Sequence, residues 1–130
     1  LISEYVGTEK TVCLNSATAA MEMVLHVLGV GSGDEVIMPA YTYTASASVV
    51  DHVGATIKMV DIRKAGSSDE DQDFEMDYEK LAEAITERTK VVVPVDLAGI
   101  CANVDKIMEV ITRPEILAKF TPANDIQDES

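Results

Sequence analysis

The sequence predicts an α/β fold, with a three-layer α/β/α arrangement around a mostly parallel sheet. Short runs rich in β-branched residues alternate along the chain with segments of helical period, a pattern typical of a parallel sheet with helices on its faces. The run 90–95 is almost continuous valine, as in strands that are buried on both faces. With 130 residues, of which 47% are hydrophobic, the chain is expected to form a single domain.

Turn and cap residues divide the chain into elements. Asp77 is expected to cap a helix that runs through Ile85, and Gly54 to end another. Helix 18–28 is apolar around most of its circumference, so we expect it to be enclosed between other elements. The remaining predictions are strands at 11–14, 35–38, 56–62 and 90–95, further helices at 44–53 and 104–111, a loop at 63–76 and an irregular tail at 112–130.

The charge balance argues against several classes of partner. The chain has 10 Lys and Arg against 23 Asp and Glu, a net charge of −13, so nucleic acids and anionic membranes are not expected partners. No apolar run approaches the roughly 18 residues that a membrane helix needs, and no signal peptide is visible. We therefore expect a soluble, cytoplasmic protein, with Cys13 and Cys101 as buried, reduced thiols.

Residues that could bind a metal lack the required spacing. A calcium-binding loop that starts at Asp69, in the acidic run 69–77, needs Gly and Glu where Phe74 and Lys80 stand. His26 and His52 each lack a second ligand at a suitable spacing. We expect a solvated loop, two structural histidines and no metal site.

The first candidate binding segment is residues 15–21. It runs from a strand through a turn of small hydroxyl residues into a helix, and the first backbone N–H groups of a helix can hold a phosphate. A plain N-cap at Ser16 or Thr18 is the alternative. The glycines of 29–33 follow a helix and precede a strand, so they are not a dinucleotide-binding fingerprint.

The second candidate segment is residues 33–43. It is predicted to be a strand that ends at Pro39 and is followed by Tyr41 and Tyr43. Two tyrosines at the end of a strand offer a flat surface for an aromatic ring, or they are core aromatics.

In their order along the chain, these segments resemble the DegT/DnrJ/StrS family of sugar aminotransferases, which use pyridoxal phosphate (PLP). The resemblance covers residues 5–127. It rests on seven ordered matches: Ser-x-Thr-Ala-Ala, Gly-x-Gly-Asp-Glu-Val-Ile-x-Pro, Tyr-Thr-Tyr-x-Ala-Ser, Gly-Ala, Val-Asp-Ile, Thr-x-Arg-Thr-Lys and Pro-Val-Asp-Leu-Ala-Gly. It implies part of the large domain of a fold-type-I aminotransferase, which transfers an amino group, usually from glutamate, to a keto-sugar carried on a nucleotide.

The resemblance also implies roles for individual residues. The backbone N–H groups of Ala17 and Thr18 and the Thr18 hydroxyl would hold the PLP phosphate, and Tyr43 would stack on the pyridine ring. Asp96, at the end of a strand, would lie near the cofactor or the substrate, because ligands of open α/β sheets bind at the carboxyl ends of the strands.

The family's Schiff-base lysine has no counterpart among the seven lysines of this sequence. We therefore expect residues 1–130 to be the N-terminal part of the PLP-binding domain, without a catalytic residue. Alone, this part is expected to have no transaminase activity and to bind PLP weakly and noncovalently, if at all.

Two other functions remain open from the sequence. One is a free-standing anion- or nucleotide-binding α/β module, and the other is an acidic interaction module that pairs through open sheet edges. The resemblance implies that strand 11–14 lies at one end of a larger sheet, and that strand 35–38 lies between strands 56–62 and 90–95 at the other. Strand 90–95 then has an open edge, which recruits partners. We expect a homo-oligomer, unless the tail 112–130 covers that edge.

Overall fold

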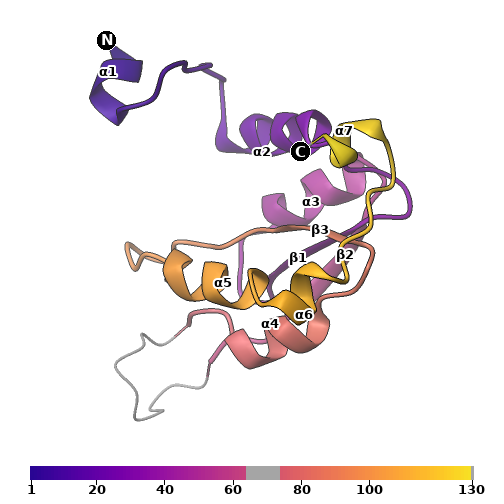
Figure 1. Cartoon of the computed structure of the whole chain (residues 1–130). Coiled ribbons are helices and arrows are strands. Elements are labelled where there is room, and N and C mark those ends of the chain that lie inside the picture. The colour runs from indigo at the N-terminus through magenta and orange to yellow at the C-terminus, as the bar shows by residue number, and fades with distance from the viewer. Residues whose placement is uncertain (64–73, 130) are drawn as a thin grey trace.

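The computed structural model describes residues 1–63 and 74–129. Its centre is a three-stranded parallel sheet of β1 (Glu35–Pro39), β2 (Thr56–Val60) and β3 (Thr89–Val92), in the order β2-β1-β3 (Figure 1). The predicted central position of the strand that begins at residue 35 is confirmed. The helices of the described ranges are α1 (Ile2–Val6), α2 (Ala17–Val27), α3 (Thr44–His52), α4 (Tyr78–Ala84), α5 (Val104–Ile111), α6 (Pro114–Leu117) and α7 (Asp125–Asp128).

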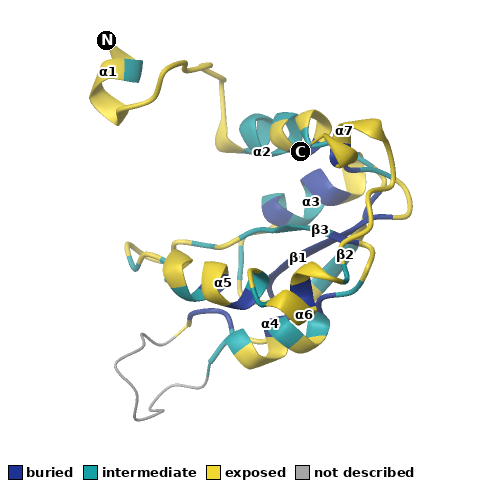
Figure 2. Ribbon diagram, in the orientation of Figure 1, coloured by how far each residue is buried: buried dark blue, intermediate teal, exposed yellow. Residues whose placement is uncertain are grey.

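Helices cover both faces of the sheet. On one face α2 and α3 pack against Val36 and Met38, and on the other face α4, α5 and α6 pack against Ile37. Because successive side chains of a strand point to opposite faces, β1 contributes to both cores, and every residue of β1 is buried (Figure 2). The predicted three-layer α/β/α fold is confirmed.

The ends of several helices lie where cap residues predict them. Asp77 is the N-cap of α4, and its carboxylate accepts hydrogen bonds from two backbone N–H groups of the first turn. Gly54 follows α3 with a φ of 78°, a left-handed conformation that favours glycine. Helix α5 has the predicted bounds, and the side chain of Asn103 caps its N-terminus.

Two predicted strands are shorter in the structure. β2 ends at Val60, although Ile62 still forms an isolated antiparallel bridge with Met76. β3 ends at Val92, and Pro94 follows shortly after, where the lack of an N–H prevents further pairing. The predicted loop 63–76, with most of its acidic run, lies largely outside the described residues.

A buried carboxylate joins the three strands. Glu35, at the start of β1, accepts hydrogen bonds from Thr86 (2.6 Å) and Arg88 (2.6 Å), which precede β3. Lys58 of β2 lies 3.4 Å from the same carboxylate. Burial alone would raise the pKa of Glu35, but the Thr86 hydrogen bond and the charges of Lys58 and Arg88 outweigh it and lower the pKa below its ordinary value.

The C-terminal segment is fixed to the turn between α2 and β1 by hydrogen bonds, of which the one between Gln127 and Asp34 is buried. The carboxylate of Asp34 accepts from the side-chain amide of Gln127 (2.9 Å) and from the N–H of Gly31 (3.0 Å). The side-chain amides of Gln127 and Asn124 both donate to the carbonyl of Gly29. We call these residues the C-terminal latch.

The segment 112–130, predicted as an irregular tail, contains two short helices. α6 begins with Pro114, whose fixed φ and missing N–H suit the first position of a helix, and Ile116 then joins the core. α7 begins after the cap residue Asn124. Before α7, the ammonium of Lys90 donates to the carbonyl of Thr121, so the tail crosses the sheet at the start of β3.

The predicted strand 11–14 is wrong. These residues are exposed and pair with no other strand of the described chain. β-Branched composition favours an extended backbone, but a strand forms only where a neighbour supplies hydrogen bonds. The predicted burial of Cys13 and Cys101 is wrong as well, since both are exposed.

The predicted enclosure of α2 is also wrong. Leu25 is buried, but Val24 and Val27 are 47% and 66% exposed. One side of α2 packs on α3, where Glu22 also pairs with His52 (3.1 Å). Apolar residues around the whole circumference indicate that a helix can be buried on every side. They do not indicate which other segment buries each side.

Candidate functional site

The candidate site lies along the carboxyl edge of the sheet. The turn from α2 to β1 is short, so α2 runs opposite to β1 and its N-terminus lies beside the end of that strand. Helix α3 begins at the end of β1, which brings its N-terminus to the same edge. Figure 1 shows the amino ends of α2 and α3 and the carboxyl ends of β1 and β3 on one side of the molecule.

The N-terminus of α2 offers free hydrogen-bond donors. Ser16 is the N-cap with an extended backbone (φ −159°), and its hydroxyl accepts from the N–H of Ala19 (3.1 Å). The carbonyl of Ser16 accepts from Ala20. The N–H groups of Ala17 and Thr18 and the Thr18 hydroxyl have no partner among the described residues.

These free donors match the chemistry of a phosphate. The first turn of α2 contains no acidic residue, so nothing in it opposes an anion at the positive end of the helix dipole. Of the two residues considered for a plain N-cap, Ser16 caps α2. This cap does not exclude a bound phosphate, because it uses a different N–H from those of Ala17 and Thr18.

The two tyrosines after β1 differ in their surroundings. The ring of Tyr41 contacts Phe74, with centroids 5.7 Å apart. Tyr43 occupies the N-cap position of α3 and is 81% exposed. A hydrogen bond between the hydroxyls of Thr42 and Ser46 (2.9 Å) holds the turn between the tyrosine positions. The ring of Tyr43 is therefore the more accessible of the two, since Tyr41 is 55% exposed.

Asp96 belongs to an exposed loop that follows β3. One of its carboxylate oxygens accepts from the N–H of Ala102 (2.9 Å) and so closes the loop. Inside the loop Leu97 and Ile100 form an antiparallel bridge, with Ala98 at a φ of 51°. Asp96 thus lies in the loop after β3, four residues beyond the end of the strand at Val92, with one carboxylate oxygen used to close that loop.

Sequence reasoning did not find the contacts that support the site. Phe74 is a partner of Tyr41 from 33 positions further along the chain, and no local pattern connects the two. The Thr42–Ser46 pair, by contrast, has the i, i+4 spacing at which side chains meet at a helix start. That spacing is a signal that the sequence does contain.

The described residues limit other assignments. In residues 1–63 and 74–129, no group of three or more His, Cys, Asp or Glu side chains could hold a metal ion. Over the same ranges, no helix is long and apolar enough to cross a membrane.

Known proteins of similar sequence include two enzymes whose names refer to nucleotide sugars. The chain is 38% identical to GDP-perosamine synthase of Caulobacter vibrioides over 88% of its own length and 29% of that protein. It is 37% identical to UDP-2-acetamido-2-deoxy-3-oxo-D-glucuronate aminotransferase of Pseudomonas aeruginosa over 86% of its length and 29% of that protein. The chain therefore spans less than a third of these relatives.

A solved structure of a sugar aminotransferase is also similar to this chain. The chain superposes on Spr1654 of Streptococcus pneumoniae, assigned as a sugar aminotransferase and solved in its PLP form, with a TM-score of 0.84 and 52% identity. The match covers 98% of this chain and 30% of that one. The profile of the DegT/DnrJ/EryC1/StrS aminotransferase family matches residues 1–118. The chain thus belongs to the DegT/DnrJ/EryC1/StrS aminotransferase family.

Proposed function

We propose that this chain is the phosphate- and ring-binding part of a PLP-dependent aminotransferase that acts on nucleotide-linked keto-sugars. The observation that carries the proposal is the set of unpartnered donors at the N-terminus of α2, at the same sheet edge as the exposed ring of Tyr43. The names of the relatives, which include a GDP-sugar synthase and a UDP-sugar aminotransferase, support the substrate class.

In this proposal each residue has one task. Ala17 and Thr18 hold the phosphate, and Tyr43 covers one face of the pyridine ring. Asp96 orients the substrate or the cofactor through the carboxylate oxygen that does not close its loop. PLP itself supplies the electron sink on which transamination depends.

No lysine of this chain forms the covalent bond to the cofactor in the proposal. Several lysines already have structural partners: Lys58 pairs with Glu35, Lys119 donates to the carbonyl of Ile85, and Lys90 donates to backbone carbonyls. This chain therefore binds and orients the cofactor, and binding by this chain alone is noncovalent.

Calorimetric titration of the full chain with PLP and with inorganic phosphate tests the phosphate site. The change Ala17→Pro removes one donor N–H at the first helical position, where proline is compatible with the helix. Loss of a hydrogen bond to a charged group is worth about 1.5–3 kcal/mol, so we expect both affinities to fall at least about tenfold. The matched control is Val104→Pro, at the first position of α5, which should leave both affinities unchanged.

Two further measurements separate this proposal from its rivals. Tyr43→Leu should weaken PLP binding but not phosphate binding, whereas an equal effect on both would contradict the ring-stacking role. Borohydride reduction in the presence of PLP should label no single lysine stoichiometrically. An anion-binding module would bind ATP as well as PLP and would ignore the Tyr43 change.

A further inference from the structure

Ser46, in the first turn of α3, is attached to the chain on both sides of the Tyr43 Cα. Its backbone N–H donates to the carbonyl of Tyr43 (3.0 Å), and its hydroxyl forms a hydrogen bond with the hydroxyl of Thr42 (2.9 Å). The start of the same turn is fixed by the N–H of Ala40, which donates to the carbonyl of Val60 (2.7 Å). Ser46 therefore fixes the direction in which the Tyr43 side chain leaves the backbone.

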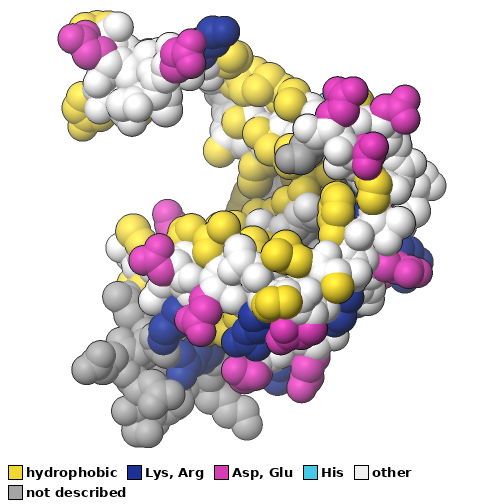
Figure 3. Space-filling view, viewed as in Figure 1, with side chains coloured by type: hydrophobic (Ala, Val, Ile, Leu, Met, Phe, Trp, Pro, Cys, Tyr) yellow, Lys and Arg dark blue, Asp and Glu magenta, His cyan; other side chains and the backbone are white. Residues whose placement is uncertain are grey.

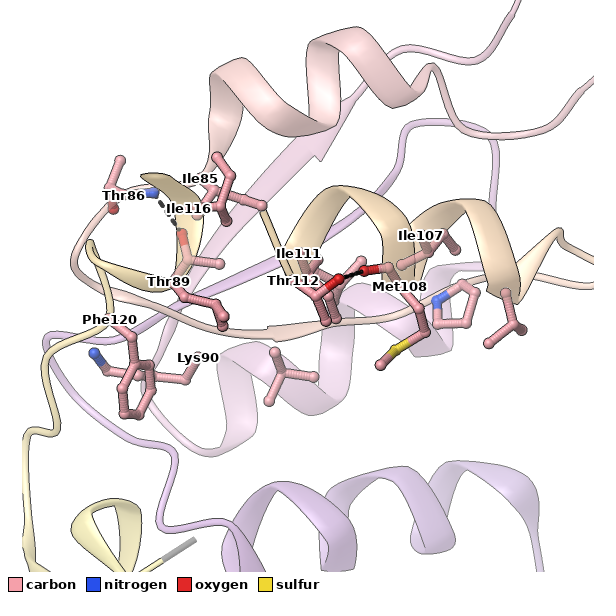
Figure 4. A pocket seen from close by; sticks show the side chains of 15 residues that line it. Ile85, Thr86, Thr89, Lys90, Ile107, Met108, Ile111, Thr112, Ile116 and Phe120 are labelled. Carbon is pink, nitrogen blue, oxygen red and sulfur yellow. Dashed lines mark hydrogen bonds between the residues drawn. The ribbon is translucent and has the colours of Figure 1, made fainter. Parts of the chain in front are cut away.

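The partner of the Ser46 hydroxyl differs from the usual partner of a hydroxyl on a helix. Such hydroxyls commonly bond to the carbonyl four residues earlier. In α3 itself, Ser48 donates in this way to the carbonyl of Thr44 (3.1 Å). Figure 4 shows a second case beside α5, where Thr112 donates to the carbonyl of Met108 (2.6 Å). Ser46 instead bonds to a side chain that precedes the helix, so its hydroxyl joins α3 to the turn.

The surroundings of Ser46 make this partner important. Ser46 is 7% exposed, and its hydroxyl has no partner other than Thr42 in the described part of the chain. The next turn of α3 contributes Val49 and Val50 to the core, and Figure 3 shows hydrophobic side chains gathered beneath α2, where Figure 1 places α3. Burial of a hydroxyl is costly unless it is hydrogen-bonded. The Thr42–Ser46 bond therefore holds both side chains in one geometry.

Tyr43 is an unfavourable residue for its own position. The N-cap of a helix favours Ser, Thr, Asp or Asn, whose side chains accept from the first N–H groups. Tyr43 is the N-cap of α3 and makes no such hydrogen bond. Residues that depart from a local rule in this way are typical of functional positions. The bond between Thr42 and Ser46 stabilises the start of α3 in place of a cap side chain.

We propose that Ser46 is a positioning residue for the cofactor ring, which holds the Tyr43 side chain in the orientation that stacks on the pyridine. This inference rests on the proposed function, because Ser46 acts through Tyr43. It concerns the ring of the ligand alone. The donors assigned to the phosphate, from Ala17 and Thr18, belong to α2 and make no hydrogen bond with Ser46, so phosphate binding should not depend on Ser46.

Calorimetric titration of the full chain with PLP and with inorganic phosphate tests this role. We expect Ser46→Ala to weaken PLP binding about two- to fivefold, within the roughly two- to tenfold range of an aromatic contact, and to leave phosphate binding unchanged. The matched control is Ser48→Ala, the same change on the same helix, which should alter neither affinity. A loss of both affinities by Ser46→Ala, or equal effects of the two variants on PLP, would overturn the positioning role.

Two further variants show whether the effect passes through the hydroxyl pair and the ring. Thr42→Val removes the partner hydroxyl and should weaken PLP binding as Ser46→Ala does, whereas Thr42→Ser retains it and should bind PLP as the wild type does. In a Tyr43→Leu background, Ser46→Ala should have no additional effect, because residues that act as a unit are not additive. Additive losses would overturn the inference.

The same set separates the inference from the proposed function. If Tyr43→Leu weakens PLP binding and Ser46→Ala does not, the positioning role is wrong and the proposed function stands. If the wild-type chain binds no PLP, both are wrong.

NMR relaxation measures the order of the turn without any ligand. We expect a backbone order parameter of about 0.85 at Tyr43 in the wild type, the value of a rigid backbone, and a clearly lower value in Ser46→Ala and in Thr42→Val. Ser48→Ala should keep the wild-type value. The same spectra show that each variant is folded. An unchanged order parameter at Tyr43 in both Ser46→Ala and Thr42→Val would overturn the inference.

Discussion

Glu35 is the residue at which the three strands converge, and its carboxylate pairs with Lys58 and Arg88. It is buried, while Arg88 and Lys58 are 60% and 31% exposed at the side chain. Removal of the carboxylate therefore leaves partners that water can still solvate. The cost is then smaller than for a pair buried on both sides.

We predict that Glu35→Gln lowers the free energy of unfolding by about 1–3 kcal/mol at neutral pH, because hydrogen bonds to a charged group are lost. The pKa of Glu35 is lowered in the folded state from 4.5, so its contribution is complete above that value and is lost as the pH falls below it. Urea unfolding at pH 7 and at successively lower pH below 4.5 checks this. The difference between the two proteins should shrink in acid.

Glu109→Gln, at an exposed position of α5, is the control for this prediction. It should change stability little at any pH. A difference between wild type and Glu35→Gln that grows in acid would contradict the sign of the pKa shift.

At the scale of elements, α4 depends on its cap. Asp77→Ala removes the acceptor for two N–H groups and should destabilise the protein by about 1 kcal/mol. Asp77→Asn retains the acceptor and should recover most of that loss. Equilibrium urea unfolding measures both variants, and equal destabilisation by the two would indicate that the charge, not the cap, is what matters.

Elements with local signals could be predicted from the sequence. Asp77 and Gly54 act over one helical turn, and the bounds of α5 follow from its own pattern of apolar residues. The strand at 11–14 and the enclosure of α2 failed because both depend on neighbours that a local pattern does not specify.

The features of the candidate site likewise fall into two groups: those that follow from local sequence and those that depend on distant segments. The cap at Ser16 and the free donors of Ala17 and Thr18 follow from their position at a helix start. The contact of Tyr41 with Phe74 and the loop closure by Asp96 depend on how distant or irregular segments fold back. Two of the partners of Glu35, Thr86 and Arg88, lie more than 50 positions away and were beyond sequence reasoning for the same reason.

At the scale of the whole molecule, the C-terminal latch joins the end of the described chain to the turn between α2 and β1. A Cβ added at Gly29, whose φ is +66°, would lie 2.8 Å from Oδ1 of Asn124. We predict that Gly29→Ala releases the latch and accelerates amide hydrogen exchange over residues 123–129, as measured by mass spectrometry.

Gly33→Ala is the matched control for the latch. Gly33 also has a positive φ (+98°), but a Cβ there would meet nothing within 4 Å. Both variants should lose about 1–2 kcal/mol for the left-handed backbone, and Gly29→Ala alone should expose the C-terminal amides. Equal exchange in the two variants would show that backbone strain, not the clash with Asn124, governs the tail.

The convergence of partners on Glu35 also implies an order of folding. The unit β1–α3–β2 is contiguous, so its strands meet after the closure of a short loop, whereas β3 must return across a longer connection. Short-range contacts form faster than long-range ones. In the early unit Glu35 has Lys58 alone, and the hydrogen bonds from Thr86 and Arg88 arrive with β3. β3 is therefore the strand that completes the hydrogen bonds of the buried carboxylate, and we expect the rate at which it docks to depend on pH.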